Sequence, residues 1–389
     1  DEKTLDELEA LLETAGGECV GKGLQNKHTP DPHSFIGEGK ADEVRQMVQS
    51  SGANLVIFDN DLTPSQLRTL EDLMKAPVLD RSALILDIFA QRAKTREGKL
   101  QVELAQYQYY LPRLTVWNEE MGRLGGSGTR GPGETQLETD KRYIRSRIQK
   151  LRAELEEVRK VRAVQRRRRI KNDVPVVALV GYTNAGKSTL LNYLTGADIP
   201  ANNRLFDTLD TTTRQLSLSD TCDVLLSDTV GFIAKLPHHL VEAFKATLEE
   251  LQYADLLIHV IDASDPEREA HMQVVERLIG ELAKPGVPVI DCYNKCDIAE
   301  NGAPRGENNV EISARTGEGI DALKALAERL LERGLHHVRL CLPYSMGGMV
   351  DTLHSQAKVL SCRYEAEGIL VEAIMDETLY GRLLPYVTE

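Results

Sequence analysis

The chain has 389 residues, of which 41% are apolar and 28% are charged, which is the composition of a soluble globular protein. Its longest apolar runs, such as Val174–Val180 and Leu256–Ile261, are far too short to span a bilayer. We therefore expect a protein without a membrane span that works in the cytoplasm. The six scattered cysteines fit reduced thiols in that compartment better than a disulfide framework.

The charge is unevenly distributed along the chain. A net charge of −13, taken alone, argues against a nucleic-acid binder. However, residues 141–171 contain 14 Lys or Arg and three acids, which gives this segment +11 and leaves −24 for the remainder. A basic segment on an acidic protein can bind a polyanion while the rest of the molecule stays well solvated.

Residues 1–82 alternate between helical patterns and short β-rich runs, and we expect a small parallel α/β subdomain. The β-rich runs are Cys19–Gly21, Asn54–Phe58 and Pro77–Leu79. A helix is expected to begin at Thr63-Pro64 and to run to Lys75.

Residues 83–171 contain two long helical patterns in which apolar residues recur at spacings of 4, 3, 4 and 3, which predicts a coiled-coil seam. The seam residues are Leu100, Leu104, Tyr107, Leu111 and Leu114 in the first helix and Ile144, Ile148, Leu151, Leu155 and Val158 in the second. The pattern predicts an antiparallel hairpin, with Pro112 kinking or ending the first helix. Two core helices of a bundle are the alternative.

A glycine-rich loop joins the two helices. Met121–Gly133 contains six glycines, which leave the backbone free to approach a partner closely. A linker has no need of arginines at the tip of a basic hairpin, so we favour a loop that enters a phosphate-lined RNA cavity. The expected RNA contacts are Arg123, Arg130, Gly131 and Gly133. The alternative is a flexible linker.

Residues 172–334 return to strand and helix alternation, which predicts a second α/β domain. Residues 335–389 follow a β-α-β-β order and predict a small α+β domain. Its strands are expected at Val338–Leu342, Lys358–Tyr364 and Ile369–Met375. The whole chain is therefore assigned to the α/β class.

The strand Val176–Val180 runs directly into Gly181-Tyr-Thr-Asn-Ala-Gly-Lys-Ser188, and a helix follows. This is the P-loop spacing in the context that the motif requires. Backbone N–H groups at the start of such a helix bind phosphate. Lys187 would reach the β- and γ-phosphates, and the Ser188 hydroxyl would take a Mg²⁺ coordination position.

Two further motifs follow at the ends of predicted strands, where doubly wound folds bind ligands. Asp228-Thr-Val-Gly231 would place an acid beside Mg²⁺ and the Gly231 N–H at the γ-phosphate. Asn294-Lys-Cys-Asp297 would identify the base, because one carboxylate can accept both the ring N1–H and the N2 amine of guanine, a pair that adenine lacks. Ser313-Ala-Arg315 would offer a backbone amide to the guanine carbonyl. The sequence thus predicts a GTPase rather than an ATPase.

A further segment, the first switch, is expected to contact the γ-phosphate, and several threonines could serve there. The candidates for the residue that contacts Mg²⁺ and the γ-phosphate are Thr208, Thr211, Thr212 and Thr213. We favour Thr208, which lies 20 residues after Ser188 and shortly before a predicted strand at Gln215–Ser219.

Phe232 stands directly after Gly231, where a glutamine would orient the attacking water. Phenylalanine cannot do this, so assistance must come from another element, a partner or a monovalent cation. Asn184 is a candidate for holding K⁺ against the phosphates. The alternative, that its side chain only fixes the loop turn, explains the residue equally well.

These motifs resemble the Obg–HflX group of translation-factor-related GTPases. The resemblance to that group rests on Gly181–Ser188, Leu205–Arg214, Asp228–Phe232 and Asn294–Asp297, and the segments that narrow it to the HflX family are Phe35–Lys40, Asp87–Arg92, Gly98–Ala105 and Gly131–Asp140. The resemblance implies a GTPase that binds the large ribosomal subunit and splits stalled or stress-arrested ribosomes. It also implies that the hairpin reaches the peptidyl-transferase region. The tail, Val338–Glu389, matches the family poorly.

The expected site follows from the motifs and the resemblance together. The catalytic residues are Lys187, Thr208 and Gly231, and the Mg²⁺ ligands are Ser188, Thr208 and Asp228. The GTP-binding residues are Gly181, Tyr182, Thr183, Asn184, Ala185, Gly186, Lys187, Ser188, Thr189, Phe206, Asp207, Thr208, Leu209, Asp210, Asp228, Thr229, Val230, Gly231, Asn294, Lys295, Cys296, Asp297, Ser313, Ala314 and Arg315.

We expect a monomer that hydrolyses GTP to GDP and phosphate with Mg²⁺, and with K⁺ as a candidate second ion. Its expected partner is the large ribosomal subunit with its ribosomal RNA. The alternative is a ribosome- or RNA-binding scaffold in which GTP is a conformational ligand and its hydrolysis is incidental.

Overall fold

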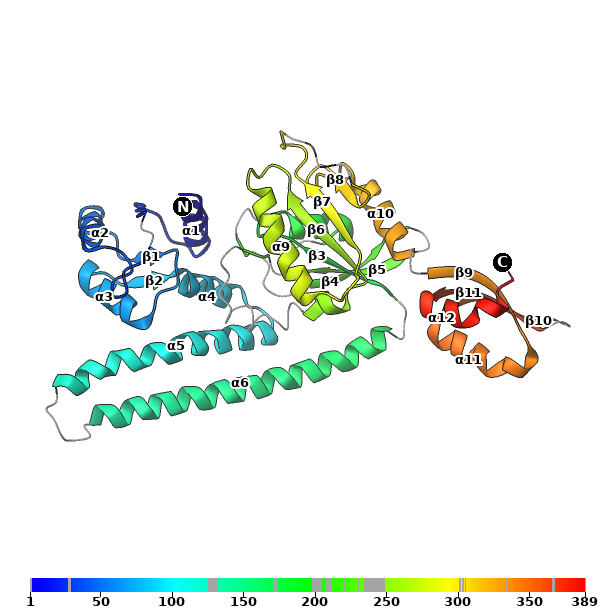
Figure 1. Ribbon diagram of the computed structural model, residues 1–389, viewed down its shortest axis with the longest axis horizontal. Coiled ribbons are helices and arrows are strands. Elements are labelled where there is room, and N and C mark those ends of the chain that lie inside the picture. Colours follow the sequence, from blue (N-terminus) through cyan, green and yellow to red (C-terminus); the bar gives the residue numbers. More distant parts are fainter. Residues whose placement is uncertain are drawn as a thin grey trace. The chain divides into compact units, whose positions relative to one another are not determined.

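The computed structural model describes residues 2–26, 29–124, 132–170, 174–197, 205–206, 212–219, 222–229, 231–233, 249–300, 302, 304, 306–332, 335–365 and 368–388 (Figure 1). The chain divides into two compact bodies. The first comprises Asp1–Lys160, Pro200–Thr211 and Val230–Leu248, and the second comprises Val161–Ile199, Thr212–Thr229 and Glu249–Glu389.

The first body begins with a small α/β subdomain. Its elements are α1 (Glu2–Thr14), α2 (Glu38–Ser51), β1 (Val56–Phe58), α3 (Pro64–Met74), β2 (Val78–Asp80) and α4 (Arg81–Arg92). The two strands pair in parallel, as predicted. The third expected run, Cys19–Gly21, forms no strand, so that prediction was wrong. Val20 is 55% exposed, and without a core face to bury it the run gains nothing from pairing.

The boundaries of α3 follow from its capping residues. The Gln66 N–H donates to Thr63 Oγ1, and the Thr63 N–H donates back to Gln66 Oε1, which completes a capping box. Pro64 occupies the first turn, and Lys75 ends the helix in a left-handed conformation. The predicted start and end of this helix are confirmed.

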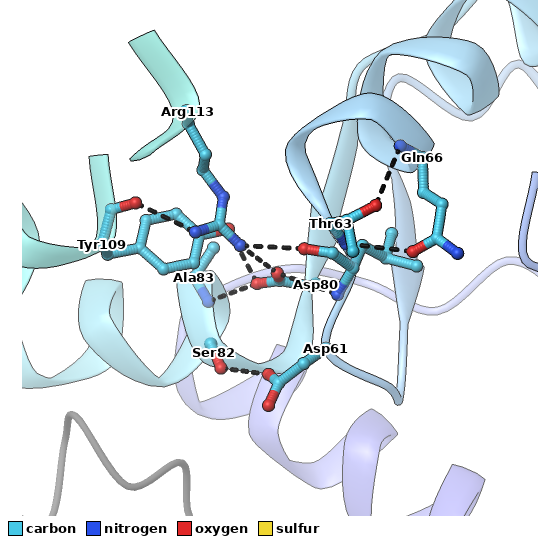
Figure 2. Close-up of polar contacts among 9 residues, drawn as sticks. Asp61, Thr63, Gln66, Asp80, Ser82, Ala83, Tyr109 and Arg113 are labelled. Atoms are coloured by element: carbon cyan, nitrogen blue, oxygen red, sulfur yellow. Dashed lines mark hydrogen bonds and ion pairs between the residues drawn. The ribbon is translucent and has the colours of Figure 1, made fainter. Parts of the chain in front are cut away.

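Helix α4 was not predicted as a separate element. It begins because Asp80, the last residue of β2, accepts the Ala83 N–H at 2.8 Å and serves as its N-cap. Asp80 also accepts hydrogen bonds from Tyr109 Oη and from the Arg113 guanidinium, both at 2.8 Å (Figure 2). The carboxylate is fully buried, so this network joins the subdomain to the following helix through a paired internal charge.

The first body also contains a helical hairpin. Helices α5 (Arg96–Leu124) and α6 (Pro132–Ile170) form an antiparallel pair, and the last ten residues of α6 belong to the second body. The buried seam residues are Leu100, Leu104, Ile148, Leu151 and Leu155, with Tyr107, Leu111, Ile144 and Val158 packed against them. The predicted hairpin is confirmed, and its seam contains every predicted residue except Leu114. The alternative of a bundle core is not needed.

Pro112 was expected to kink or to end α5 near its last turn. The expected ending was wrong, because the helix continues to Leu124. Pro112 removes one backbone donor from the helix. The lost donor would have paired with the Gln108 carbonyl. The Arg113 side chain donates to the neighbouring Tyr109 carbonyl at 2.9 Å. Packing of the seam and the Asp80 network hold this region in place.

The second body contains a six-stranded sheet in the order β4-β5-β3-β6-β7-β8, with only the β4–β5 pair antiparallel. Its strands are β3 (Val176–Val180), β4 (Thr212–Ser217), β5 (Asp223–Asp228), β6 (Leu256–Asp262), β7 (Val289–Asn294) and β8 (Asn309–Glu311), and the helices around it are α7 (Lys187–Thr195), α9 (Arg268–Leu282) and α10 (Ile320–Glu332). A 3-10 turn, Glu249–Tyr253, precedes β6.

The two faces of this sheet are covered by different helices. Ile258 and Val260 pack in one core with side chains of α7 and α10. Ile261 and Tyr293, whose side chains alternate with these along the strands, pack on the other face with Met272 of α9. Both faces of the central strands are therefore buried, which explains their continuous apolar runs. The predicted parallel α/β arrangement is confirmed.

The chain ends in a three-stranded antiparallel sheet in the order β10-β11-β9. Its elements are β9 (Leu335–Leu342), α11 (Gly347–Gln356), β10 (Lys358–Glu365), β11 (Gly368–Asp376) and α12 (Glu377–Leu383), with 3-10 turns at Tyr344–Met346 and Leu384–Tyr386. The predicted β-α-β-β order is confirmed, and α12 is an addition to it. Across the described part of the chain, no helix is both long and apolar enough to cross a membrane.

Candidate GTP site

The glycines of the phosphate loop are required by close approaches. Gly181 has a φ of 153°, and a Cβ there would lie 2.2 Å from the Val260 carbonyl oxygen on the neighbouring strand β6. Gly186 has a φ of 97°, and its Cβ would lie 2.2 Å from Nδ2 of Asn294. The loop therefore packs against β6 on one side and against the Asn294–Asp297 motif on the other, where any side chain would clash.

Lys187 is the first residue of α7, and its ammonium is held inside the loop. Nζ donates to the carbonyl oxygens of Gly181 at 3.0 Å and Tyr182 at 2.8 Å. Burial lowers the pKa of Lys187 to about 8, and the nearby charge of Asp228 opposes this shift. A nucleotide phosphate beside Nζ would favour the charged form and strengthen the contact.

Ser188 and Asp228 meet at the carboxyl ends of the neighbouring strands β3 and β5. Ser188 Oγ donates to Asp228 Oδ2 at 2.8 Å. A hydroxyl and a carboxylate side by side are the hard oxygen donors that Mg²⁺ prefers. This donor set therefore fits the metal that was predicted at these two residues.

The Asn294–Asp297 motif is joined to the phosphate loop and to the Ser313–Arg315 loop. Asn294 Nδ2 donates to the Ala185 carbonyl at 2.8 Å, and its Oδ1 accepts the Ala314 N–H at 2.9 Å. The Lys295 ammonium reaches Asp262 Oδ2 at 2.6 Å, while Asp297 is exposed to solvent. One amide side chain thus connects three of the predicted motifs.

Asn184 lies at the tip of the phosphate loop. It is exposed and adopts a φ of 62°, a left-handed conformation that asparagine tolerates better than most residues. Its backbone therefore gives one sufficient reason for the residue. The K⁺ role stays a prediction.

The structure places the other predicted site residues as follows. Thr183 and Thr229 are buried, and Thr229 Oγ1 donates to the Leu179 carbonyl at 2.7 Å. Thr189 lies in the first turn of α7, and Cys296 and Arg315 lie in the base-side loops. In the first body, Gly231 is buried, and the Phe206 ring packs edge-on against Phe89 of α4 with 4.8 Å between ring centroids. The role of Phe206 in nucleotide binding stays a prediction.

Several predicted residues fall outside the described part of the chain. They are Asp207, Thr208, Leu209, Asp210, Thr211, Val230, Arg130 and Gly131. Arg123 lies near the end of α5, and Gly133 lies in the first turn of α6. The predicted loop, 121–133, was therefore too long at both ends, because the two helices extend into it.

The sequence analysis did not identify the residues that pack against the phosphate loop from β6 and α9. Asp262 is the last residue of β6, Asp265 follows three residues later, and His271 of α9 stacks on Tyr182. The one available signal was the acid pair at the carboxyl end of a predicted parallel strand, a position that carries function in this fold. The contact between His271 and Tyr182 had no sequence signal, because it joins two elements far apart in the chain.

Comparisons with known proteins identify the class of protein to which the chain belongs. Three family models match the chain: "GTP-binding GTPase N-terminal" over residues 2–90, "GTP-binding GTPase Middle Region" over 92–169, and "50S ribosome-binding GTPase" over 176–295. A GTPase HflX of Caldanaerobacter subterraneus is 47% identical over 389 residues, which cover 100% of this chain and 91% of that protein. The GTPase HflX of Escherichia coli is 48% identical, covering 87% of this chain and 82% of its own.

Among solved structures, the SsGBP–GDP complex is similar, with a TM-score of 0.51 and 26% identity over 86% of this chain and 97% of the other. The fold, the phosphate loop and the base-side motif define a P-loop GTPase, an enzyme that hydrolyses GTP. The full-length relatives narrow the class further, and the chain belongs to the HflX family of GTPases.

Proposed function

We propose that this GTPase binds the large ribosomal subunit and dissociates stalled or stress-arrested ribosomes into subunits, with the hairpin and its glycine-rich loop reaching the peptidyl-transferase region. The observation that carries the proposal is a long two-helix hairpin whose second helix is strongly basic. The third matching family is described as a 50S ribosome-binding GTPase, which supports the choice of the large subunit.

The hairpin uses different surfaces to pack its two helices together and to attract RNA. One side of α6 is buried in the seam around Leu151. Its other sides expose basic side chains to solvent, among them Arg142, Arg145, Lys150 and Arg152. Such a helix can attract RNA phosphates by a salt-dependent, sequence-independent force while the seam keeps it rigid.

In this proposal GTP binds across the carboxyl end of the six-stranded sheet. Backbone N–H groups of residues 181–189 and the Lys187 ammonium bind the phosphates, and Asp297 accepts the two donors of the guanine edge. Thr208 and Gly231 contact the γ-phosphate from the two switches, and Phe206–Asp210 and Val230 complete the nucleotide contacts. Asn294, Lys295, Cys296 and Ser313–Arg315 form the base pocket.

Magnesium would be held by Ser188, Asp228 and Thr208, and when bound it neutralises charge on the β- and γ-phosphates. Because Phe232 cannot orient water, hydrolysis in the isolated protein should be slow and should rise when the large subunit binds. K⁺ held at Asn184 is the proposed second source of assistance. Equal hydrolysis rates in K⁺ and Na⁺ would remove the cation from this scheme and leave activation by the ribosome.

The deciding experiment is sedimentation of intact ribosomes with the full chain and GTP, GDP or a non-hydrolysable GTP analogue. The proposal expects separated subunits with a triphosphate and intact ribosomes with GDP. GTP hydrolysis should be measured in parallel with and without large subunits. A scaffold that uses GTP only as a conformational ligand would bind the subunit without dissociating ribosomes, and that result would overturn the proposal. Sedimentation of the protein alone tests the proposed monomeric state.

A further inference from the structure

A histidine of helix α9 is stacked on the aromatic ring of the phosphate loop. The His271 imidazole and the Tyr182 phenol lie face to face, with 3.8 Å between ring centroids and 12° between ring planes. Tyr182 is the second residue of the loop and is buried. His271 lies in the first turn of α9 and approaches the loop from outside the predicted motifs.

The carboxylate of Asp265 fixes the orientation of the imidazole. Nδ1 of His271 lies 2.7 Å from Asp265 Oδ2, and Asp265 Oδ1 accepts the Glu267 N–H at 2.8 Å. The hydrogen bond with His271 lowers the pKa of Asp265, against the opposing effect of burial. The carboxylate is thus held by the backbone at the start of α9, and it holds the ring in turn.

The stack lays the imidazole over the face of the Tyr182 ring, and Asp265 pairs with the same imidazole at Nδ1. A cation over the face of a tyrosine is attracted by the negative charge on the ring face. An imidazolium between Asp265 and Tyr182 would satisfy both neighbours at once.

The stacked tyrosine also positions the lysine expected to contact phosphate. Lys187 Nζ donates to the Tyr182 carbonyl at 2.8 Å. The carbonyl and the stacked ring belong to one residue, so a shift of the ring moves an acceptor of Lys187. Small displacements of a binding group can cost a large part of its effect on a reaction.

The loop between β6 and α9 supports the base-side motif as well. Asp262, three residues before Asp265, accepts Lys295 Nζ through Oδ2 at 2.6 Å and the Ser264 N–H through Oδ1 at 3.0 Å. The positive charge of Lys295 also contributes to the lowered pKa of Asp265. The short segment from Asp262 to Asp265 therefore contacts both sides of the site: Asp265 holds His271 against the phosphate loop, and Asp262 pairs with Lys295 of the base-side motif.

We propose that His271 is a positioning residue for GTP hydrolysis: held by Asp265, it stacks on Tyr182 and thereby fixes the phosphate loop and Lys187 for the nucleotide phosphates. This goes beyond the family's GTPase activity by assigning a role to a helix outside the nucleotide motifs. It requires no ribosome, so it stands or falls separately from the proposed function.

The test uses the full chain with Mg²⁺, a fluorescent GDP analogue for affinity and steady-state GTP hydrolysis for kcat and KM. H271A should weaken GDP binding by about three- to tenfold, the scale of one partly desolvated cation–π contact. H271R should restore most of the affinity, because a planar guanidinium can stack on Tyr182 and pair with Asp265. Gln273→Ala, at an exposed position of the same helix, is the matched control and should bind as the parent does.

A double-mutant cycle separates positioning from general stability. If His271 acts through Tyr182, then Tyr182→Ala combined with H271A should cost little more affinity than either change alone. Should H271A fold poorly by circular dichroism, H271F replaces it, since it keeps an aromatic ring that can neither carry a charge nor pair with Asp265. Parent-like binding by H271A, equal weakness of H271R and H271A, or independent effects in the cycle would each overturn the assignment.

Discussion

Gly186 shows how closely two motifs approach each other at the scale of single residues. A methyl group there would meet the Asn294 amide nitrogen at 2.2 Å, and the φ of 97° already disfavours a side chain. We expect Gly186→Ala to weaken GTP binding by about tenfold or more, since overpacking of this kind costs roughly 1–3 kcal/mol and displaces Asn294. The measurement is a GTP-binding titration.

Gly196 provides the matched control for this prediction. It also has a left-handed φ, of 64°, at the end of α7, but a Cβ there would meet nothing within 4 Å. Gly196→Ala should lower stability through backbone strain while leaving GTP affinity at the parent level. Equal losses of affinity in the two variants would show that strain, rather than the clash with Asn294, is responsible.

Asp297 should determine the choice of base. Asp297→Asn should lose about a hundredfold or more in GTP affinity, because two hydrogen bonds to a charged group disappear, and should gain affinity for xanthosine triphosphate, whose extra carbonyl accepts from the new amide. Glu300→Gln removes a nearby exposed carboxylate and serves as the control. An unchanged preference for GTP over xanthosine triphosphate would refute the role of Asp297.

The residues that the sequence made predictable are those whose function needs a fixed local spacing. The two glycines of the phosphate loop and the Asn294–Asp297 motif could be placed because each lies within a short segment at a strand end. The Ser188–Asp228 hydrogen bond followed from two such segments on neighbouring parallel strands. The stack of His271 on Tyr182 could not be predicted, since it depends on where α9 crosses the loop in three dimensions.

At the scale of elements, the buried charge network around Asp80 fixes the hairpin to the α/β subdomain (Figure 2). Arg113→Ala would leave the fully buried Asp80 carboxylate without its cationic partner. We expect a loss of about 3–5 kcal/mol in the free energy of unfolding of this region, as for other broken buried ion pairs. Urea unfolding followed by the fluorescence of Trp117, the single tryptophan and a residue of α5, measures it.

The ion pair between Arg147 of α6 and Glu103 of α5 offers a comparison within the same hairpin. Its side chains are 29% and 35% exposed, at an N–O distance of 2.7 Å. Arg147→Ala should cost only about 0.2–1 kcal/mol, because solvent screens the pair. Equal costs for the Arg113 and Arg147 changes would contradict the view that burial makes the Asp80 network decisive.

Periodicity predicted the elements that are buried on one regular face and failed where tertiary contacts decide. The 4, 3, 4, 3 spacing identified the hairpin seam because the two helices bury that spacing against each other. Helix α4 shows no such spacing of apolar residues, because it is buried on several sides. It also begins at the N-cap Asp80, and in the sequence this residue looks like the end of a strand. At Pro112 the helix continues despite the backbone rule, because the seam and the Asp80 network pack the residues around it.

At the scale of the whole molecule, the basic segment and the nucleotide-binding motifs lie in different parts of the chain. The basic segment 141–171 carries +11 on a chain whose other residues sum to −24. The nucleotide motifs of the second body lie at the ends of a six-stranded sheet and share no residue with the glycine-rich loop, 121–133. A defect in one function should therefore be separable from a defect in the other.

The glycine-rich loop gives the sharpest test of that separation. Replacing Gly125–Gly133 by a shorter neutral turn should preserve GTP binding and basal hydrolysis and abolish ribosome dissociation, because the backbone could no longer approach RNA closely. Salt-sensitive binding to the large subunit should persist through the exposed arginines of α6. Replacing Arg145 and Arg152 by Gln should make this binding less sensitive to salt. The slope of log affinity against log salt concentration should fall by roughly one unit for each RNA phosphate that is no longer neutralised. Sedimentation of ribosomes and filter binding at several salt concentrations provide the two readouts. If the chain with the replaced loop dissociates ribosomes at the parent rate, the loop is only a linker and the RNA contacts at Arg123, Arg130, Gly131 and Gly133 must be abandoned.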